Sequence, residues 1–381
     1  MLANKIGTWL PSLGNIAHGL LNSLRVVGSL IILSWLLPYC GKATKPKPVT
    51  CNIYISATGW HSTKPSSRFD QLYVYDADSL SLIDSIPLTS MADALEVSPD
   101  GRCLYAQCVD GGLFKIDALT RNVVWSVPGM GRITLVDAGR LVAREGLEGT
   151  DVIDVTDGHV IKQLPLDIRV LSGPSNGTTV AAILDDTTPD FHGDSAVTVF
   201  DVRTGAHYGY YVPRLSTGEA LQAIYVARLH PDGKRVAVIG LFGSVRYCWF
   251  MVGDVLTGET LLRQQITRPF GDIAISEDGK LAVVTDPGQP WYGEGGNGPS
   301  VFDLTTLKHL KTLREESDLL SWAPAQVRFV SGDRKIAFAP YPMWGGGTVF
   351  IVNRATLVGE RAAEKPYSGA FLGALGTGPR P

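Results

Sequence analysis

The sequence predicts an all-β fold: a seven-bladed β-propeller with four-stranded blades. Three observations lead to this prediction. A turn anchored by Asp or Asn recurs seven times, a second turn lies upstream of six of those anchors, and one spare strand remains at each end of the repeat region. The 42 glycines and 23 prolines agree with a chain that has many tight turns.

The first recurring turn consists of an apolar pair, an Asp or Asn, and a Thr, Ser or Gly two to four residues later, as in VYDADSL at 74–80 and VFDVRTG at 199–205. The anchoring side chain accepts hydrogen bonds from the backbone just ahead and so closes a hairpin. Successive anchors are 41, 37, 47, 53, 49 and 50 residues apart, a spacing typical of propeller blades. The anchors are Asp76, Asp117, Asp154, Asp201, Asp254, Asp303 and Asn353.

The second turn precedes the first and has the form SPDG or a variant of it. Clear copies are SPDGRCLYA at 98–106, HPDGKRVAV at 230–238 and SEDGKLAVV at 276–284. Proline presets φ at the second turn position, and glycine at the fourth supplies a permissive dihedral angle. Two hairpins per repeat require four strands, which is one propeller blade. His230 occupies the position of Ser98 and Ser276, and we interpret it as a turn residue.

The two ends of the repeat region are expected to close the ring. The strand predicted at 51–57 has no inner neighbour in its own repeat, and a spare strand is predicted at 368–375, after the seventh repeat. Pairing the two would complete blade one and remove exposed sheet edges. The expected domains are an N-terminal segment and tether at 1–50, the propeller at 51–376 and a short tail at 377–381.

These repeats resemble the YVTN type of β-propeller, a WD40-like family with the rhythm SPDG-k-xYV followed by v-D-xxT. The resemblance covers about residues 51–376 and lacks the GH and WD signatures of ordinary WD40 repeats. It implies the fold but leaves function open, because such propellers serve many roles. Similar propellers include lactonases and the large subunit of quinoprotein amine dehydrogenases.

The charge balance and the cysteine spacing exclude several classes of function. Lys plus Arg number 34 and Asp plus Glu 37, so general nucleic-acid binding has no electrostatic basis. The five cysteines form no CxxC or CxxCH pattern, which disfavours zinc and covalent haem. Cys103 and Cys108 should share one strand but point to opposite faces, so they should not bond each other.

The N-terminal region predicts export or membrane attachment. Residues 26–37, VVGSLIILSWLL, follow Lys5 and Arg25 and precede the polar stretch GKATKPKP. Twelve apolar or small residues suit a signal-peptide core better than a membrane span of about 20 residues. A signal peptide cleaved near residue 40, an uncleaved anchor, a lipid-modified Cys40 and a buried helix of a cytosolic protein are the four alternatives. The favoured location is extracytoplasmic, periplasmic or secreted, with or without a membrane anchor.

The loops between the second and third strands of each blade should all emerge on one face of the ring, opposite the hairpins. These loops are long in four blades, at 58–71, 185–195, 286–300 and 340–348. Blades six, seven and one are neighbours in a closed ring, so their loops should form one aromatic surface. This surface would either bind an unidentified protein or small molecule or cap the core. Its residues are Trp60, His61, Trp291, Tyr292, Tyr341, Met343 and Trp344.

Two other sets of side chains are candidates for ligand binding. The blade-four loop carries acidic residues around His192, which offer a site for calcium or another divalent metal, although an acidic loop is more often simply solvated. Residues at the starts of inner strands should face the central channel, where they would bind water, a polar ligand or a metal. The acidic set is Asp185, Asp186, Asp190 and Asp194, and the channel set is Asp93, Arg132, Arg169, Asp272 and Gln326.

The sequence favours a binding or scaffold propeller over an enzyme. It contains no nucleophile elbow, phosphate loop, dinucleotide fingerprint or HExxH motif, and no cofactor is predicted. The alternative is a propeller enzyme or enzyme subunit. A lactonase would need convergent carboxylates and a metal at the channel mouth, and Asp93 and Asp272 are the acids available there.

Overall fold

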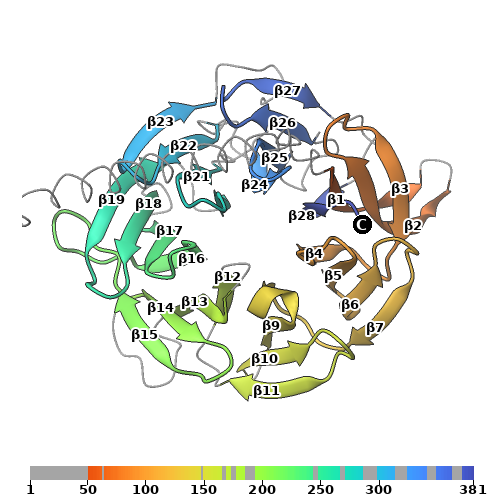
Figure 1. Ribbon diagram of the computed structural model, residues 1–381, viewed down its shortest axis with the longest axis horizontal. Helices are drawn as coiled ribbons and strands as arrows, with labels where there is room; N and C mark the ends of the chain where they lie inside the picture. Colours follow the sequence, from red (N-terminus) through yellow and green to blue (C-terminus); the bar gives the residue numbers. More distant parts are fainter. Residues whose placement is uncertain are drawn as a thin grey trace, which may run out of the picture. The chain divides into compact units, whose positions relative to one another are not determined.

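The computed structural model divides into two compact units, residues 1–48 and 49–381. It describes residues 50–381 except for internal gaps, and the second unit is a ring of seven four-stranded antiparallel sheets (Figure 1). No helix among these residues is long and apolar enough to cross a membrane. The gaps are 62–63, 147–148, 165–168, 173–176, 185–193, 243–247, 267–270, 286–297, 314–323, 341–348 and 363–370.

Blade one joins the two ends of the propeller sequence, as predicted. Its strand order is β28-β1-β2-β3, and β28 pairs antiparallel with β1 from Cys51 opposite Pro379 to Thr58 opposite Phe371. The closing strand therefore extends past residue 376, into the stretch expected to be a tail. Its strands are β1 (Cys51–His61), β2 (Lys64–Asp76), β3 (Leu82–Pro87) and β28 (Phe371–Pro379).

Blades two, three and four follow in chain order around the ring. A short 3-10 helix, η2 (Asp137–Gly139), forms the first hairpin of blade three. Their strands are β4 (Ala92–Val97), β5 (Cys103–Cys108), β6 (Gly112–Asp117) and β7 (Val123–Val127); β8 (Ile133–Val136), β9 (Leu141–Gly146), β10 (Gly149–Asp154) and β11 (Val160–Leu164); and β12 (Arg169–Ser172), β13 (Thr179–Leu184), β14 (Ala196–Asp201) and β15 (His207–Tyr211).

Blades five, six and seven complete the ring, and blade seven lies beside blade one. Their strands are β16 (Ala223–Leu229), β17 (Arg235–Leu241), β18 (Cys248–Asp254) and β19 (Thr260–Ile266); β20 (Ile273–Ile275), β21 (Leu281–Val284), β22 (Ser300–Asp303) and β23 (Lys308–Thr312); and β24 (Pro324–Val330), β25 (Lys335–Pro340), β26 (Phe350–Asn353) and β27 (Gly359–Ala362).

The turn chemistry predicted from sequence is present in all seven blades. Asp117 Oδ1 accepts hydrogen bonds from Leu119 N at 3.0 Å and Thr120 N at 2.6 Å. The anchor of blade seven, Asn353, accepts from Ala355 N and Thr356 N in the same way. Each anchor thus fixes the hairpin between the third and fourth strands of its blade, independently of the rest of the ring.

The core lies between blades. The described residues form seven apolar clusters, and each bridges two neighbouring blades. Cys103 and Cys108 of β5 illustrate the arrangement: Cys103 packs toward blade three and Cys108 toward blade one. The prediction that these thiols point to opposite faces is therefore confirmed. Because each sheet buries both faces, no blade has a complete core by itself.

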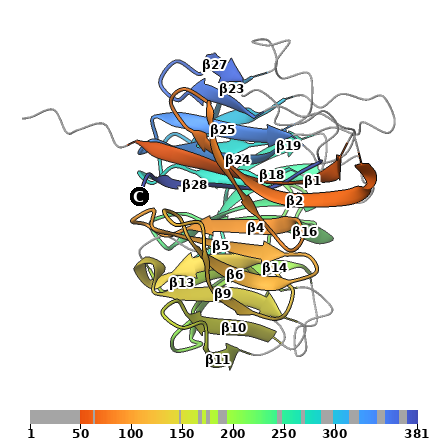
Figure 2. The same cartoon turned by 90° about the vertical axis from the view of Figure 1, so that its right-hand side faces the viewer.

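One predicted loop is a strand pair instead. The sequence suggested an irregular loop at 58–71, but β1 continues to His61 and β2 begins at Lys64, with Trp60 opposite Arg68. The residues between Thr58 and Gln71 contain no Pro-Gly or Asn-Gly turn signal, so the two strands continue to pair beyond the blade. Figure 2 shows this arm projecting from the ring.

Candidate functional site

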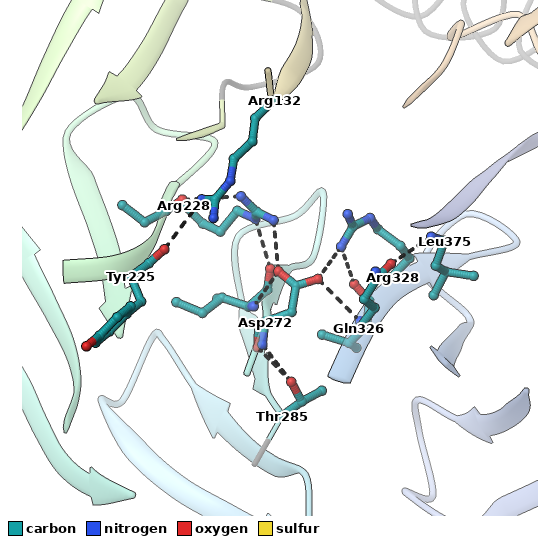
Figure 3. A network of polar contacts seen from close by, with 11 residues as sticks. Arg132, Tyr225, Arg228, Asp272, Thr285, Gln326, Arg328 and Leu375 are labelled. Carbon is teal, nitrogen blue, oxygen red and sulfur yellow. Dashed lines mark hydrogen bonds and ion pairs between the residues drawn. The ribbon is translucent and has the colours of Figure 1, made fainter. Parts of the chain in front are cut away.

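The candidate site lies in the central channel, where inner strands from different blades bring ionisable side chains together. Asp272 immediately precedes β20 of blade six, Arg228 lies in β16 of blade five and Arg328 in β24 of blade seven. Figure 3 shows the two guanidinium groups converging on the Asp272 carboxylate. The sequence predicted Asp272 to face the channel, and its partners come from the inner strands on either side.

Asp272 is held by two arginines and by backbone amides. Its Oδ1 accepts from Arg228 Nη2 at 2.8 Å and its Oδ2 from Arg328 Nη1 at 2.5 Å. The backbone N–H of Ile273 donates to Oδ1 at 2.9 Å, and that of Val327 to Oδ2 at 3.4 Å. Burial alone would raise the pKa of this carboxyl, but the two arginines outweigh burial and hold the pKa below its usual value.

Two further acids in the channel wall have pKa values above the usual value, in contrast to Asp272. Desolvation raises the pKa of Glu96 in β4, although Arg328 and Arg228 act against it. Desolvation also raises the pKa of Asp93, which keeps contact with solvent and is only weakly compensated by Arg132. Asp93 sits at a bulge in the pairing of β4 with β5. These two carboxyls therefore lose their charge at a higher pH than Asp272 does.

Arg132 is the least engaged of the channel arginines. It precedes β8, is exposed, and donates through Nη1 to the Tyr225 carbonyl oxygen at 3.5 Å. Among the residues that the structure describes, no carboxylate lies within 4.0 Å of its guanidinium nitrogens. Arg132 is near enough to Arg228 to lower its pKa, after burial and Arg328. The channel thus holds two positive groups side by side (Figure 3), and among the described residues Arg132 forms no ion pair, although Asp93 is near enough to feel its charge.

Gln326 has a structural contact in the channel wall. Its Oε1 accepts a hydrogen bond from the Leu375 backbone N–H at 2.7 Å, which ties β24 to the closing strand β28. Arg169 begins β12 as predicted, but its side chain lies outside the described residues. His230 is a turn residue, as predicted: Nδ1 accepts from Asp232 N at 3.1 Å, and Nε2 reaches the Gly279 carbonyl of blade six at 2.8 Å.

The sequence did not identify Glu96, Arg228 or Arg328. Alternation along a strand offered a signal for Arg328, because it lies two residues after Gln326 and on the same side of β24. Nothing in the sequence near Arg228 distinguishes it from a surface arginine. Its role depends on the neighbouring blade that supplies Asp272.

The predicted aromatic surface falls mostly outside the described residues. Trp60 and His61 lie in the projecting part of β1, and their side chains are not described. The other members of the set lie in the gaps 286–297 and 341–348. These are Trp291, Tyr292, Tyr341, Met343 and Trp344.

The acidic loop of blade four is also largely outside the described residues. Asp185, Asp186, Asp190 and His192 fall in the gap 185–193, whereas exposed Asp194 accepts from Arg214 Nη2 at 2.8 Å. Among the described residues, no three His, Cys, Asp or Glu side chains cluster closely enough to hold a metal.

A depression of about 660 Å³ lies on the hairpin face, at the junction of blades six and seven. Arg354 crosses this junction: its Nη2 donates to both carboxylate oxygens of Asp278, at 2.9 and 2.7 Å, and its Nη1 lies 3.4 Å from Asp333 Oδ2. Burial raises the pKa of Asp333. Because the charged groups already satisfy each other, this depression is better explained as a joint between blades than as a ligand site.

Fold and channel together define the protein as a closed seven-bladed β-propeller with an arginine-rich centre. It is similar to a solved chain of Kuenenia stuttgartiensis hydrazine synthase, with a TM-score of 0.55 and 16% identity over 76% of this chain and 93% of that one. No family model matches the chain, and no curated protein matches it. Because 1345 solved chains match, the similarity establishes the fold and does not select a function.

Proposed function

We propose that this protein is an extracytoplasmic binding propeller, built from degenerate YVTN-type repeats, whose channel takes a small anionic ligand such as a carboxylate, sulfate or phosphate. One observation carries the proposal: Arg132 lies beside Arg228 in the channel without a carboxylate partner among the described residues. An anion between these two guanidinium groups would relieve their repulsion and accept charge-assisted hydrogen bonds.

The state of the neighbouring acids supports the same ligand class. Asp272 neutralises one positive charge and is fully engaged with Arg228 and Arg328. Glu96 and Asp93 have raised pKa values, because desolvation disfavours their charged forms, even though Asp93 keeps contact with solvent. The cluster therefore favours an added negative charge over an added positive one. Export or anchoring through residues 26–37 remains part of the proposal on the strength of the sequence alone.

A second candidate is an enzyme or a subunit of one, because the similar solved chain is that of a hydrazine synthase. A general base works best with a pKa near the working pH. Asp272 is a poor base by this criterion, since two arginines and two amides hold it ionised. A lactonase-like or dehydrogenase-subunit role would thus need groups other than Asp272. Binding is the better-supported function.

Sulfate is the appropriate first probe, because its charge stays constant across the pH range of interest. We expect sulfate to bind the purified full-length chain and to raise its melting temperature, since a ligand that binds only the folded state stabilises it. Arg132→Gln should weaken sulfate binding at least tenfold, because a charge-assisted hydrogen bond contributes about 1.5–3 kcal/mol and about 1.4 kcal/mol is a factor of ten in affinity. Titration calorimetry measures the affinity directly.

The matched control is Arg102→Gln. Arg102 is 79% exposed on the hairpin face and pairs loosely with Asp100 at 3.9 Å. This substitution removes the same charge from the protein but not from the channel. Equal sulfate affinities in the two variants would show that any binding is a response to net charge, and the channel proposal would fail.

A further inference from the structure

Large apolar side chains are exposed on the outer strands, and they gather at one end of those strands. In three successive blades, the sixth and seventh residues after the Asp turn anchor are both apolar and 44–54% exposed. We call these six residues the apolar rim. They are Leu82, Ile83, Val123, Val124, Val160 and Ile161.

The apolar rim is continuous along one side of the ring. Its residues begin β3, β7 and β11, the outermost strands of blades one, two and three, which follow one another around the circumference (Figure 1). Blade four extends it with Tyr208 of β15, which is 48% exposed. In blade six only the seventh position, Leu310, is an exposed apolar residue (49%), and in blade seven the same two positions are Gly359 and Glu360, so the pair of exposed apolar residues is confined to blades one to three.

The fold by itself does not explain why the apolar rim is exposed. Adjacent residues of a strand point in opposite directions, and a solvent-facing outer strand normally carries polar residues on its open side. Charged groups lie beside the rim and have partners: Asp84 pairs with Arg121 at 3.2 Å, exposed Asp157 contacts His159, and Lys162 Nζ donates to the Arg203 carbonyl oxygen. The rim is therefore an apolar strip bordered by engaged polar groups, with a tyrosine at one end.

The chain joins the propeller at the same end of blade one. The Thr50 carbonyl oxygen accepts from Arg380 N, and the Cys51 carbonyl oxygen accepts from Ala77 N, in the turn of anchor Asp76. Leu82 pairs with Tyr75 just after that turn. Only β2 separates β1 from β3, so Ile53, which pairs with Tyr75, lies about 10 Å from Leu82, and Thr50, three residues before Ile53 in the chain, lies about 14 Å from it.

The length of the preceding sequence limits how far the rim can be from a membrane. Residues 38–49 connect the apolar stretch 26–37 to Thr50. Twelve residues span at most about 40 Å even when fully extended. If residues 26–37 lie in a bilayer, the end of blade one that carries the rim must stay near its surface.

We propose that the apolar rim rests on the surface of the membrane that holds residues 26–37, with Leu, Val and Ile side chains in the interfacial layer. This inference rests on the anchoring alternative of the proposed function, in which residues 26–37 stay in the membrane instead of being removed with a signal peptide. Apolar residues with a neighbouring tyrosine are the composition that favours a bilayer interface. The occupant is the lipid surface, because the chain that joins the ring beside the rim carries the apolar stretch.

The test uses the full-length chain in phosphatidylcholine vesicles. An environment-sensitive NBD fluorophore is attached to a cysteine introduced by Val124→Cys, and quenching by spin-labelled phosphatidylcholine is measured. The matched control is Met130→Cys, because Met130 is 59% exposed but lies between blades two and three on the opposite face. The unsubstituted chain gives the background from native thiols. We expect quenching at position 124 to exceed that at 130 several-fold.

Alkaline extraction of the same vesicles separates the two ways in which the inference can fail. If the chain stays with the lipid and both labels are quenched equally, the rim does not face the membrane while the anchor stands. If the chain is released, the anchor is wrong and the rim inference falls with it. Fluorescence at position 124 that responds to dilution of the protein but not to spin-labelled lipid would show that a second copy covers the rim, which also overturns the inference.

Discussion

Asp272 connects three blades through one side chain. Its carboxylate receives Arg228 from blade five and Arg328 from blade seven, and its backbone N–H donates to Thr285 Oγ1 at 2.6 Å within blade six. Two part-buried guanidinium groups therefore share this one carboxylate as their bonded acid, and Glu96 also acts on both electrostatically. A cluster of this kind has little effect on the free energy of unfolding while all its members are present. Removing one member is strongly destabilising, because it leaves a charge without its partner.

We expect Asp272→Asn to lower the free energy of unfolding by about 3–5 kcal/mol, because it removes the carboxylate that both arginines bind, and desolvation disfavours the charged form of Glu96, another acid that acts on them. Urea unfolding measures the change. The control is Asp194→Asn, which breaks a pair whose side chains are about half exposed and should change stability by about 0.5 kcal/mol or less. A small loss for both would mean that Asp272 is not a structural clamp, and a catalytic role would become the better explanation.

At the scale of single elements, β28 is the strand on which ring closure depends. It pairs with β1 over most of its length, and Leu375 is fully buried in the cluster between blades seven and one. Thr377 Oγ1 also donates to the Phe329 carbonyl oxygen of β24. β28 thus pairs with the N-terminal strand β1 inside blade one and also contacts β24 of the C-terminal blade seven.

Truncation after residue 370 should lower the free energy of unfolding by several kcal/mol, on the order of 5, since it exposes the β1 edge and the core beneath it. Thermal and urea unfolding both report this loss. Truncation after Arg380 is the control, because it keeps the whole strand and the contacts of Arg380 with Asn52 and Asp76 and removes only Pro381. An unchanged melting temperature after the longer truncation would argue against closure by β28.

The channel is a property of the whole molecule, because its charged groups come from five blades. Glu96 and Asp93 belong to blade two, Arg132 to blade three, and the Asp272 clamp to blades five, six and seven. Since the pKa values of Glu96 and Asp93 are raised and that of Asp272 is lowered, these acids do not lose their charge together. As pH falls, the channel becomes more positive before the clamp is lost.

Sulfate affinity should therefore increase as pH falls from 7 through the raised pKa values of Glu96 and Asp93, which lie above the usual carboxyl range of about 4. Asp272 stays ionised in that window and keeps the site intact. Calorimetric titration at several pH values measures the trend. Glu96→Gln should raise the affinity at pH 7 and flatten the pH dependence; the same slope in this variant would exclude Glu96 as its source.

Local features of the fold were predictable because each is encoded within a few residues. Asp117 and Asn353 accept hydrogen bonds from amides two and three residues ahead, so their turns could be read directly from sequence. The count of seven blades and the pairing of the chain ends followed from these turns. The arm between Thr58 and Gln71 was missed because continued strand pairing there depends on cross-strand partners and not on a turn signal.

The sequence by itself determined the blade count, the hairpins, the opposite orientation of Cys103 and Cys108, and the presence of Asp272 in the channel. Only the tertiary structure decided that Arg228 and Arg328 flank Asp272 and that the charges of these three residues act on Glu96. The reason is physical: these residues are separated by 44 positions or more in the chain, and ring closure brings their inner strands together. Contacts made by closure depend on the summed geometry of all seven blades, which no single repeat encodes.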